Sequence, residues 1–171
     1  MRFSAEAGCD CGSEATVVIG VISDTHGLLR RQALTALGGS DYIIHAGDIG
    51  DPRILDQLSQ LAPVTAVRGN VDSGEWAAKI QPTNTLEVEA VCFYVLHNLA
   101  ELDLKPEAGG FSAVIYGHSH VAKQEIKNGV LYFNPGSAGP RRFRLPVTVG
   151  RLQLRAHRVT AEIVDLAPGS E

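Results

Sequence analysis

The first half of the sequence alternates continuous apolar runs with segments of helical periodicity, and this alternation limits the folds open to the chain. The apolar runs contain many β-branched residues, as is typical of strands buried on both faces, and they occupy residues 16–23, 41–48 and 63–70. The segments between them, residues 27–39 and 51–62, each predict a helix. A βαβαβ order with right-handed crossovers predicts a largely parallel sheet.

The second half predicts strands joined by hairpins. One alternating segment has an expected turn near Glu89 and Ala90, although no glycine stands there. A further hairpin has Asn128 and Gly129 at its tip, which is a strong turn signal. Residues 147–166 add two more strands. A sandwich of two sheets flanked by helices therefore fits the whole pattern.

The length and charge of the chain indicate one compact domain. With 171 residues, we expect a flexible leader at residues 1–15, the domain at 16–167 and a short tail at 168–171. The net charge of −4 provides no positive field for nucleic acid. No apolar run approaches the roughly 20 residues that a membrane span needs. We therefore expect a cytoplasmic protein that has neither a membrane nor nucleic acid as a partner.

The three cysteines do not demand an oxidising compartment. Cys9 and Cys11 lie in the expected leader, where a Cys-x-Cys pair could bind a soft metal, but no second pair follows them. An unstructured leader is therefore the interpretation we favour. Cys92 lies in an apolar strand, where a thiol is usually a small buried hydrophobic group.

Metal-competent side chains follow the expected strands at the points where the strands end. Seven such residues follow five strands: Asp24, His26, Asp48, Asn70, His97, His118 and His120. In an open α/β sheet, functional groups collect beyond the carboxyl ends of the strands, so we expect these side chains to converge. Asp24 and His26 are two residues apart, and in an extended chain this spacing directs both side chains the same way. The same expectation holds for His118 and His120.

Each of these residues alone has a simpler interpretation. Asp24 could cap the following helix, Asn70 could adopt a left-handed turn, and a lone histidine at a strand end is usually a hydrogen-bonded surface residue. Their joint occurrence, which includes four of the six histidines, favours a metal site. Imidazole, carboxylate and amide ligands without a thiolate suit Mn, Fe, Zn or Ni. Seven ligands are too many for one such ion and suit two ions that share Asp48.

Six short blocks follow one another along the chain: SDTHG, AGD, RGN, LH, GHSH and NPGS. In this order they resemble the calcineurin-like metallophosphoesterase superfamily, and in particular its small prokaryotic branch of YfcE-like phosphodiesterases. The likeness runs from Val18 to Val164. It implies the α/β fold of that family, a four-layer α/β/β/α sandwich of two mixed β-sheets flanked by helices (the metallo-dependent phosphatase fold).

The resemblance also implies a dinuclear-metal-dependent phosphoesterase, and we expect a phosphodiesterase. It implies that one ion is held by Asp24, His26, Asp48 and His120, and the other by Asp48, Asn70, His97 and His118. Two divalent ions, with Mn expected and Fe, Zn or Ni as alternatives, would share a bridging hydroxide that attacks phosphorus. His97 or Asn70 would stabilise charge on the phosphate oxygens, so the expected catalytic residues are Asp48, Asn70 and His97. The expected partner is a small phosphodiester substrate.

Two positions depart from the family pattern. Members with a strong general acid carry a histidine directly after Asn70, where this chain has Val71, and Asp72 nearby has no assigned role. Without that proton donor we expect substrates with good leaving groups, such as aryl or nucleotide-like phosphodiesters. Many relatives have glycine where this chain has Asn98 beside His97.

Several residues outside the ligand set keep two interpretations. Arg141 and Arg142, close behind the NPGS turn, could bind a second phosphate group of the substrate or could pair with surface acids. Asn134 is expected to brace the site. His45 is expected to be a satisfied core histidine, and His157 to be solvated.

Two other functions use the same fold. It serves as a protein-binding scaffold in the retromer complex, where metal ligands are partly lost, but here all seven positions are filled, which favours catalysis. A nuclease needs a surface for nucleic acid, and this acidic chain offers little for the phosphates of a duplex. The sequence does not decide between a monomer and a homo-oligomer.

Overall fold

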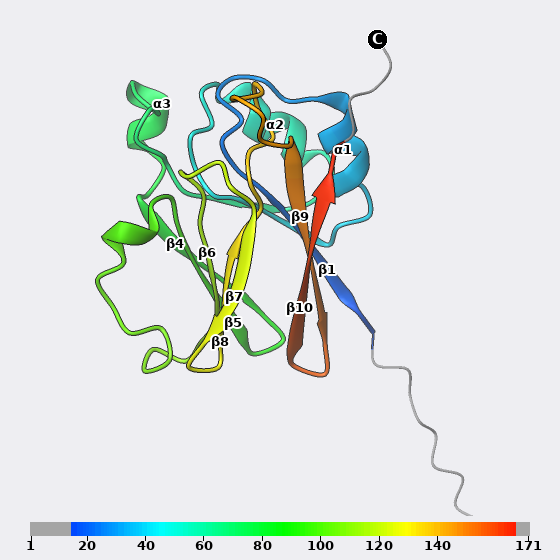
Figure 1. Ribbon diagram of the computed structural model, residues 1–171, viewed down its shortest axis with the longest axis vertical. Helices are drawn as coiled ribbons and strands as arrows, with labels where there is room; N and C mark the ends of the chain where they lie inside the picture. Colours follow the sequence, from blue (N-terminus) through cyan, green and yellow to red (C-terminus); the bar gives the residue numbers. More distant parts are fainter. Residues whose placement is uncertain (1–14, 167–171) are drawn as a thin grey trace, which may run out of the picture.

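A computed structural model describes residues 15–166, which form two five-stranded sheets packed face to face (Figure 1). Apart from Ala15, the expected leader and tail at residues 1–15 and 168–171 lie outside the described residues, and so do Cys9 and Cys11. Within residues 15–166, every helix is too short or too polar to cross a membrane.

The first sheet has the strand order β10-β9-β1-β2-β3, and β1, β2 and β3 are parallel, as the sequence predicts. Its strands are β1 (Val17–Ile22), β2 (Tyr42–His45), β3 (Val64–Ala66), β9 (Thr148–Arg155) and β10 (Arg158–Asp165). Helices α1 (Arg31–Leu37) and α2 (Arg53–Ser59) form the crossovers. Gly20 in β1 allows α1 to pack closely, because a Cβ at this position would lie 2.6 Å from Leu37 Cδ2.

The second sheet has the order β4-β5-β6-β8-β7, with a parallel centre flanked by two hairpins. Its strands are β4 (Thr83–Val88), β5 (Val91–Leu96), β6 (Phe111–Ile115), β7 (Lys123–Lys127) and β8 (Val130–Asn134). The turn between β4 and β5 forms without glycine, because Glu89 and Ala90 both adopt left-handed φ angles of 48° and 63°. Asn128 and Gly129 form the other tip as predicted, with φ angles of 51° and 79°.

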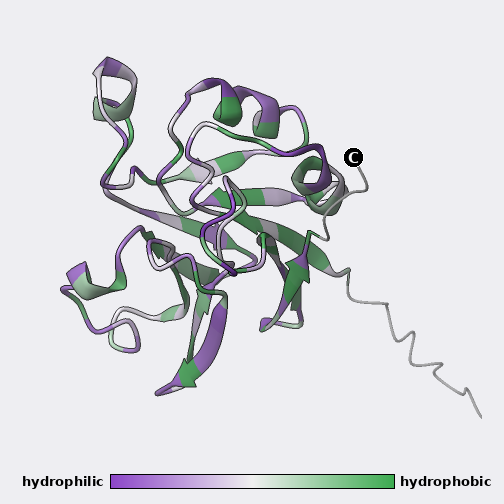
Figure 2. Cartoon of the chain, turned by 45° about the horizontal axis from the view of Figure 1, so that its top comes forward, coloured by the Kyte–Doolittle hydropathy of each residue, from purple (hydrophilic) through white to green (hydrophobic). Residues whose placement is uncertain are grey.

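The main core lies between the two sheets. Ile19 and Ile44 of the first sheet belong to one apolar cluster with Phe93 and Phe133 of the second, and none of the four has exposed surface. Gly150 in β9 leaves room for the ring of Phe133, because a Cβ there would lie 2.6 Å from its Cζ atom. In Figure 2 the hydrophobic residues gather on the strands of the sandwich, and hydrophilic residues lie on the loops, on the helices and on the edge strand β7. Full burial of such side chains contributes about 1.5–3 kcal/mol each.

The two outer layers of the sandwich differ in thickness. On the first sheet, α1 and α2 bury Leu37 and Leu58 in a second apolar cluster. On the second sheet the cover is the segment 99–110, in which the only helical element is the single 3-10 turn η1 (Leu99–Glu101). The remaining helix of the described residues, α3 (Glu75–Ala78), follows β3. The predicted α/β/β/α fold is confirmed, with its fourth layer reduced to one turn and a loop.

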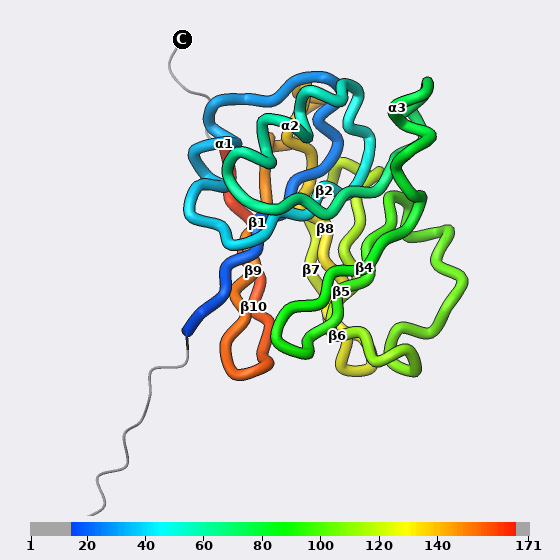
Figure 3. The backbone as a smooth tube through the Cα atoms, turned by 180° about the vertical axis from the view of Figure 1, so that it is seen from behind, coloured from blue at the N-terminus to red at the C-terminus, as the bar shows by residue number. Residues whose placement is uncertain are grey.

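The molecule has two different ends. The loops after the carboxyl ends of β1, β2, β3, β5, β6 and β8 lie together at the top of Figures 1 and 3, and we call this the loop end. The hairpin turns at residues 89–90, 128–129 and 156–157 lie at the bottom, and we call this the hairpin end. There the exposed ring of His157 joins two hairpin tips, because its Nδ1 atom lies 2.9 Å from the carbonyl oxygen of Glu89.

Candidate metal centre

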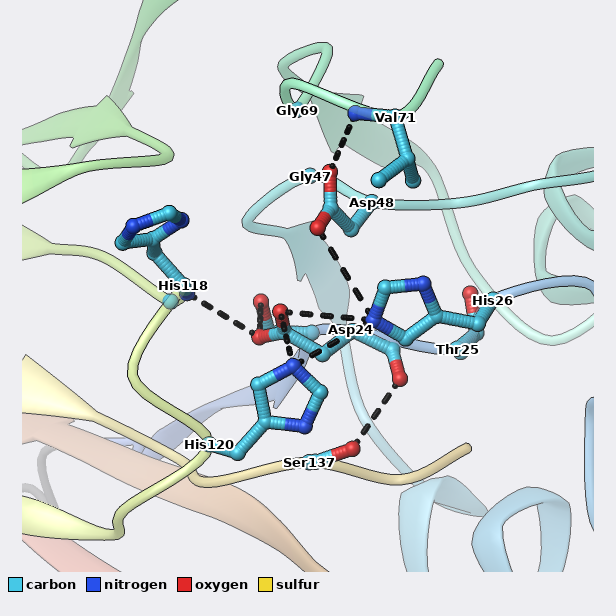
Figure 4. A network of polar contacts seen from close by, with 12 residues as sticks. Asp24, Thr25, His26, Gly47, Asp48, Gly69, Val71, His118, His120 and Ser137 are labelled. Atoms are coloured by element: carbon cyan, nitrogen blue, oxygen red, sulfur yellow. Dashed lines mark hydrogen bonds and ion pairs between the residues drawn. The ribbon is translucent and has the colours of Figure 1, made fainter. Parts of the chain in front are cut away.

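The structure brings all seven candidate ligands together at the loop end, and each follows the strand that the sequence predicts. They are Asp24 and His26 after β1, Asp48 after β2, Asn70 after β3, His97 after β5, and His118 and His120 after β6. Figure 4 shows Asp24 at the centre of the site, with the side chains of His26, Asp48, His118 and His120 around it. Their convergence is the expected consequence of parallel strands that end at one edge of each sheet.

The first group of ligand atoms surrounds Asp24. Its Oδ1 atom lies 3.3 Å from His120 Nε2 and 3.9 Å from His26 Nε2, and these two nitrogens are 3.3 Å apart (Figure 4). All three ligand atoms lie within 4.8 Å of one another. Three ligand atoms this close together can bind one cation between them.

The carboxylate of Asp24 has one satisfied and one orphaned oxygen. Oδ2 accepts hydrogen bonds from the Ser23 hydroxyl at 2.7 Å and from the backbone N–H of His118 at 3.2 Å. Oδ1 is buried and has no hydrogen-bond donor among the described residues. Burial raises the pKa of Asp24, because desolvation disfavours its charged form. A cation beside Oδ1 would remove this penalty, so the site fits a metal ion.

The second group of ligand atoms surrounds His97. Its Nδ1 atom donates to the carbonyl oxygen of Ala46 at 2.7 Å, which leaves the lone pair of Nε2 free. That Nε2 atom lies 3.3 Å from Asp48 Oδ2 and 3.2 Å from Asn70 Oδ1. His118 Nδ1 lies 3.0 Å from the same Asn70 oxygen. The four side chains thus direct imidazole, carboxylate and amide ligand atoms at one another, a set that suits a borderline divalent ion.

Asp48 lies between the two groups. Its Oδ2 atom is 3.8 Å from His26 Nε2 on one side and 3.3 Å from His97 Nε2 on the other. Its Oδ1 atom accepts a hydrogen bond from the N–H of Val71 at 3.0 Å. Burial acts to raise the pKa of Asp48, but the contacts with His97 and Val71 outweigh it and hold that pKa below its ordinary value. The carboxylate is therefore charged and reaches both groups, as a bridging ligand requires.

The expectation that residues two apart point the same way in an extended chain is wrong for the GHSH block. His118 and His120 have left-handed φ angles of 70° and 59°, so the chain there is not extended. The ring of His118 is exposed and lies against Asn70, whereas His120 is buried against Asp24 and His26. The bends separate the two rings, and each ring joins a different ligand group.

Asp72, whose role the sequence left open, is a backbone anchor. Its carboxylate accepts hydrogen bonds from the N–H groups of Gly69 at 2.8 Å, Gly50 at 2.8 Å and Ile49 at 3.1 Å. These amides belong to the loops that carry Asp48 and Asn70. The carboxylate therefore holds two ligand loops together, and its oxygens are occupied as acceptors.

His45, fully buried at the end of β2, supports the loops that carry the ligands. Its Nδ1 atom accepts from the N–H of Gly47 at 3.2 Å, and its Nε2 atom lies 2.9 Å from the hydroxyl of Thr25. Thr25 in turn donates to the carbonyl of Ile49 at 2.9 Å. Complete burial lowers the pKa of His45 to about 3, so the ring is neutral. As expected, it is a satisfied core histidine that fixes the residue between Asp24 and His26.

Two asparagines fix the loops that carry the histidine ligands. Asn134 braces the GHSH loop, because its amide nitrogen donates to the carbonyl of Gly117 at 2.9 Å and to the hydroxyl of Ser119 at 3.1 Å. Asn98 caps η1, because its side-chain oxygen accepts from the N–H of Ala100 at 3.1 Å. The side chain that replaces the common glycine beside His97 thus acts as a helix cap.

The sequence reasoning missed the residues that pack directly against Asp24. A Cβ at Gly117 would collide with the Ser23 hydroxyl and lie 2.7 Å from Asp24 Oδ2. Ser137, in the NPGS block, donates from its hydroxyl to the backbone carbonyl of Asp24 at 3.1 Å. The small residues inside the motif blocks were the available signal, because such residues mark positions where backbone and ligands approach closely.

Arg141 and Arg142 are exposed on the segment after the NPGS block. Arg141 Nε donates to the carbonyl of Leu145 at 3.4 Å. Within residues 15–166, neither guanidinium takes part in a salt bridge, so the expected alternative of pairing with surface acids is not seen there. Their assignment to a substrate phosphate stays a prediction.

A two-sheet sandwich with paired carboxylate, imidazole and amide ligands at its strand ends is the architecture of a metal-dependent hydrolase. Residues 17–157 match the calcineurin-like phosphoesterase superfamily domain. The chain therefore belongs to the calcineurin-like phosphoesterase superfamily, and it is a metallophosphoesterase, as the motif blocks predicted. This family uses divalent metal ions.

Relatives with assigned names agree with this result. A probable metallophosphoesterase of Methanocaldococcus jannaschii is 34% identical over 135 residues, which cover 71% of this chain and 68% of the relative. The phosphodiesterase YfcE of Escherichia coli is 25% identical over 154 residues, which cover 76% of this chain and 84% of YfcE. The expected resemblance to the YfcE-like branch is confirmed.

Solved structures share the fold. An archaeal phosphodiesterase superposes with a TM-score of 0.70 at 25% identity, covering 86% of this chain and all of that protein. Vacuolar protein sorting 29 of Cryptosporidium parvum superposes with a TM-score of 0.76 at 17% identity, covering 91% of this chain and 94% of that protein. At this low identity, the second likeness is evidence for the fold alone.

Proposed function

We propose that this protein is a two-ion phosphodiesterase that hydrolyses small phosphodiesters with good leaving groups. The observation that carries the proposal is the position of Asp48, whose Oδ2 atom lies within 4 Å of a histidine nitrogen from each ligand group. A single carboxylate that faces two ligand groups supports a pair of ions at a short separation.

The proposed ligand sets follow the two groups. One ion would be held by Asp24, His26, Asp48 and His120, and the other by Asp48, Asn70, His97 and His118. Bound divalent ions would supply positive charge for the phosphate oxygens and would lower the pKa of water, which provides a nucleophile near neutral pH. We propose Mn as the ion that gives the highest activity, with Fe, Zn and Ni as the alternatives, and the cytoplasm as the compartment.

The proposed roles of the protein's own residues follow from their burial. Asp24 and His120 are buried, so they are suited to fixing an ion and to excluding water from beneath it. Asn70 and His118 are exposed, so their polar atoms are accessible to a substrate phosphate. His97 is held in one ring orientation by the carbonyl of Ala46, which favours a fixed position during charge stabilisation.

The preference for good leaving groups rests on the residues after Asn70. Val71 is 46% exposed at the position where relatives with a strong general acid have histidine, and its side chain cannot donate a proton. Asp72 is occupied by three backbone amides. A leaving group with a low pKa departs without protonation, so aryl and nucleotide-like esters are the proposed substrates. The names of the phosphodiesterase relatives support a phosphodiester as the substrate.

The decisive experiment compares a diester with the matching monoester. Metal-free protein is reconstituted with Mn, Ni, Zn or Mg and assayed with bis(p-nitrophenyl) phosphate and with p-nitrophenyl phosphate. We expect kcat/KM to be higher for the diester with every active metal, and the highest rate with Mn. A higher kcat/KM for the monoester would replace the phosphodiesterase proposal with a phosphatase.

The alternative is a metal-poor protein-binding scaffold, and the fold likeness to vacuolar protein sorting 29 is the observation that favours it. The complete set of seven ligands argues against it, because a scaffold has no need of an orphaned buried carboxylate oxygen such as Asp24 Oδ1. Metal analysis of protein purified without a chelator separates the two. About two equivalents of metal with diester hydrolysis supports the enzyme, and metal-free, inactive protein that regains no activity with any of the four ions supports the scaffold.

A further inference from the structure

Phe143 combines two unfavourable properties on the segment between β8 and β9. Its side chain is 94% exposed, the highest value among the exposed large hydrophobic residues of the structure. Its φ angle is 53°, in the left-handed region where bulky residues are strained. An exposed aromatic ring on strained backbone adds nothing to the core, so a binding role is the natural reason for it.

The segment that carries Phe143 is fixed to the metal centre at its base. The N–H of Ala138 donates to the carbonyl of Ser23 at 3.1 Å, and a Cβ at Gly139 would collide with the backbone carbonyls of Asp24 and Thr25. Arg30 also donates to the carbonyl of Gly139 at 3.3 Å. In Figure 1 this segment lies at the loop end, above β8 and β9. Its starting point beside Asp24 keeps residues 140–146 close to the ligand groups.

The tip of the segment is a tight turn with a high density of positive charge. The N–H of Leu145 donates to the carbonyl of Arg142 at 3.1 Å, so Phe143 and Arg144 occupy the two corners of the turn. Arg141, Arg142 and Arg144 are all exposed, and no acidic residue occurs between positions 140 and 147. Arg142 follows three residues after Gly139, which packs against the backbone carbonyls of Asp24 and Thr25.

We propose that residues 140–146 form the substrate-recognition element for nucleotide-like phosphodiesters, with the base stacked on Phe143 and the phosphate in contact with Arg142. The inference rests on the proposed phosphodiesterase function and narrows its substrate class. Every nucleobase has a π-face, so a single exposed aromatic ring binds bases without reading their sequence. A guanidinium on a segment that starts beside Asp24 would provide a matching contact for the negative phosphate oxygens.

The test uses two esters that share a p-nitrophenolate leaving group and one negative charge. Thymidine 5′-(p-nitrophenyl phosphate) carries a base, and methyl p-nitrophenyl phosphate does not. The variant is Phe143→Asn, because asparagine tolerates a left-handed φ and removes the ring, so its melting temperature should be at least that of the wild type. The matched control is Ile126→Asn, which removes another exposed apolar side chain, 74% exposed, from the edge strand β7.

The measured quantity is kcat/KM for the thymidine ester divided by kcat/KM for the methyl ester. We expect Phe143→Asn to lower this ratio by about tenfold, which is the rate equivalent of losing one base-stacking contact. Arg142→Gln should lower kcat/KM for both esters by similar factors, and Ile126→Asn should change neither. If both esters are hydrolysed and Phe143→Asn leaves their ratio unchanged, the recognition element is wrong and the phosphodiesterase stands. If the wild type hydrolyses neither ester with any metal, the proposed function fails and this inference fails with it.

Discussion

Left-handed backbone occurs at both ends of the molecule, and the comparison shows two reasons for the same strain. At the hairpin end the left-handed non-glycine residues are Glu89, Ala90, Asn128, Ala156 and His157. Two-residue hairpins require such φ angles to match the twist of the strands, and all five side chains are exposed. There the turn geometry alone dictates the backbone.

At the loop end the side chains explain the backbone. The left-handed residues there include Asp24, His26, Asp48, His118 and His120, which are five of the seven candidate ligands. Most of them are buried or half-buried, and each bend directs a ligand atom toward the others. Strain of this kind persists only where the surroundings hold it, and here the hydrogen bonds of Asp72, His45 and Asn134 do so.

The largest expected difference between the two ends is the loss of activity and of bound metal when a carboxylate is replaced. Asp48→Asn should lower kcat/KM for bis(p-nitrophenyl) phosphate by at least about a hundredfold and reduce bound metal, because the shared anchor of both ligand groups loses its charge. Glu89→Gln at the hairpin end is the control, and it should retain wild-type activity and metal content. Kinetics and elemental analysis measure both. Wild-type turnover and metal content in Asp48→Asn would show that the ligand assignment is wrong.

Glycine replacement compares the packing of the two ends. A Cβ at Gly117 meets Ser23 and Asp24, whereas a Cβ at Gly129 meets nothing within 4 Å. Gly117→Ala should lower the free energy of unfolding by about 1–3 kcal/mol and reduce activity, because Asp24 must move. Gly129→Ala should lower stability by about 1 kcal/mol through its φ of 79° and leave activity unchanged. Urea denaturation and diester kinetics give the values, and equal activity losses in both variants would contradict the comparison.

The order of strands and helices could be predicted because each buried strand is a continuous apolar run, and the ligand residues could be found because they follow those runs. The bends could not be predicted from spacing, since the left-handed φ of His118 and His120 depends on contacts from other loops. The role of Asp72 was hidden for the same reason, because two of its three amide donors, Ile49 and Gly50, lie 23 and 22 residues away in the sequence and meet it only when the chain folds. The turn at Glu89 and Ala90, in contrast, could be predicted from local sequence. Apolar and polar residues alternate around it, and this pattern located the turn although it has no glycine.

Asp72→Asn tests whether this carboxylate is an anchor or a proton donor. Loss of a charged acceptor for three amides should lower the free energy of unfolding by about 1–3 kcal/mol and reduce activity. If Asp72 is an anchor, Asp72→Asn should slow the hydrolysis of bis(p-nitrophenyl) phosphate and of diphenyl phosphate by the same factor. A proton donor matters more for the poorer leaving group, so a larger loss with diphenyl phosphate would identify Asp72 as the general acid.

The smallest expected effect concerns the hydrogen bond between His157 and Glu89, which joins two hairpin tips. His157→Gln should lower the free energy of unfolding by about 0.5–1 kcal/mol, because the exposed hydrogen bond from the ring to the carbonyl of Glu89 is lost. Diester kinetics and metal content should equal those of the wild type, because the hairpin end lies opposite the ligand loops. Urea denaturation of His157→Gln and of Gly129→Ala under the same conditions would compare the changes in the free energy of unfolding that the two substitutions cause. A loss of activity in His157→Gln would show that the two ends are coupled and that the division between them fails.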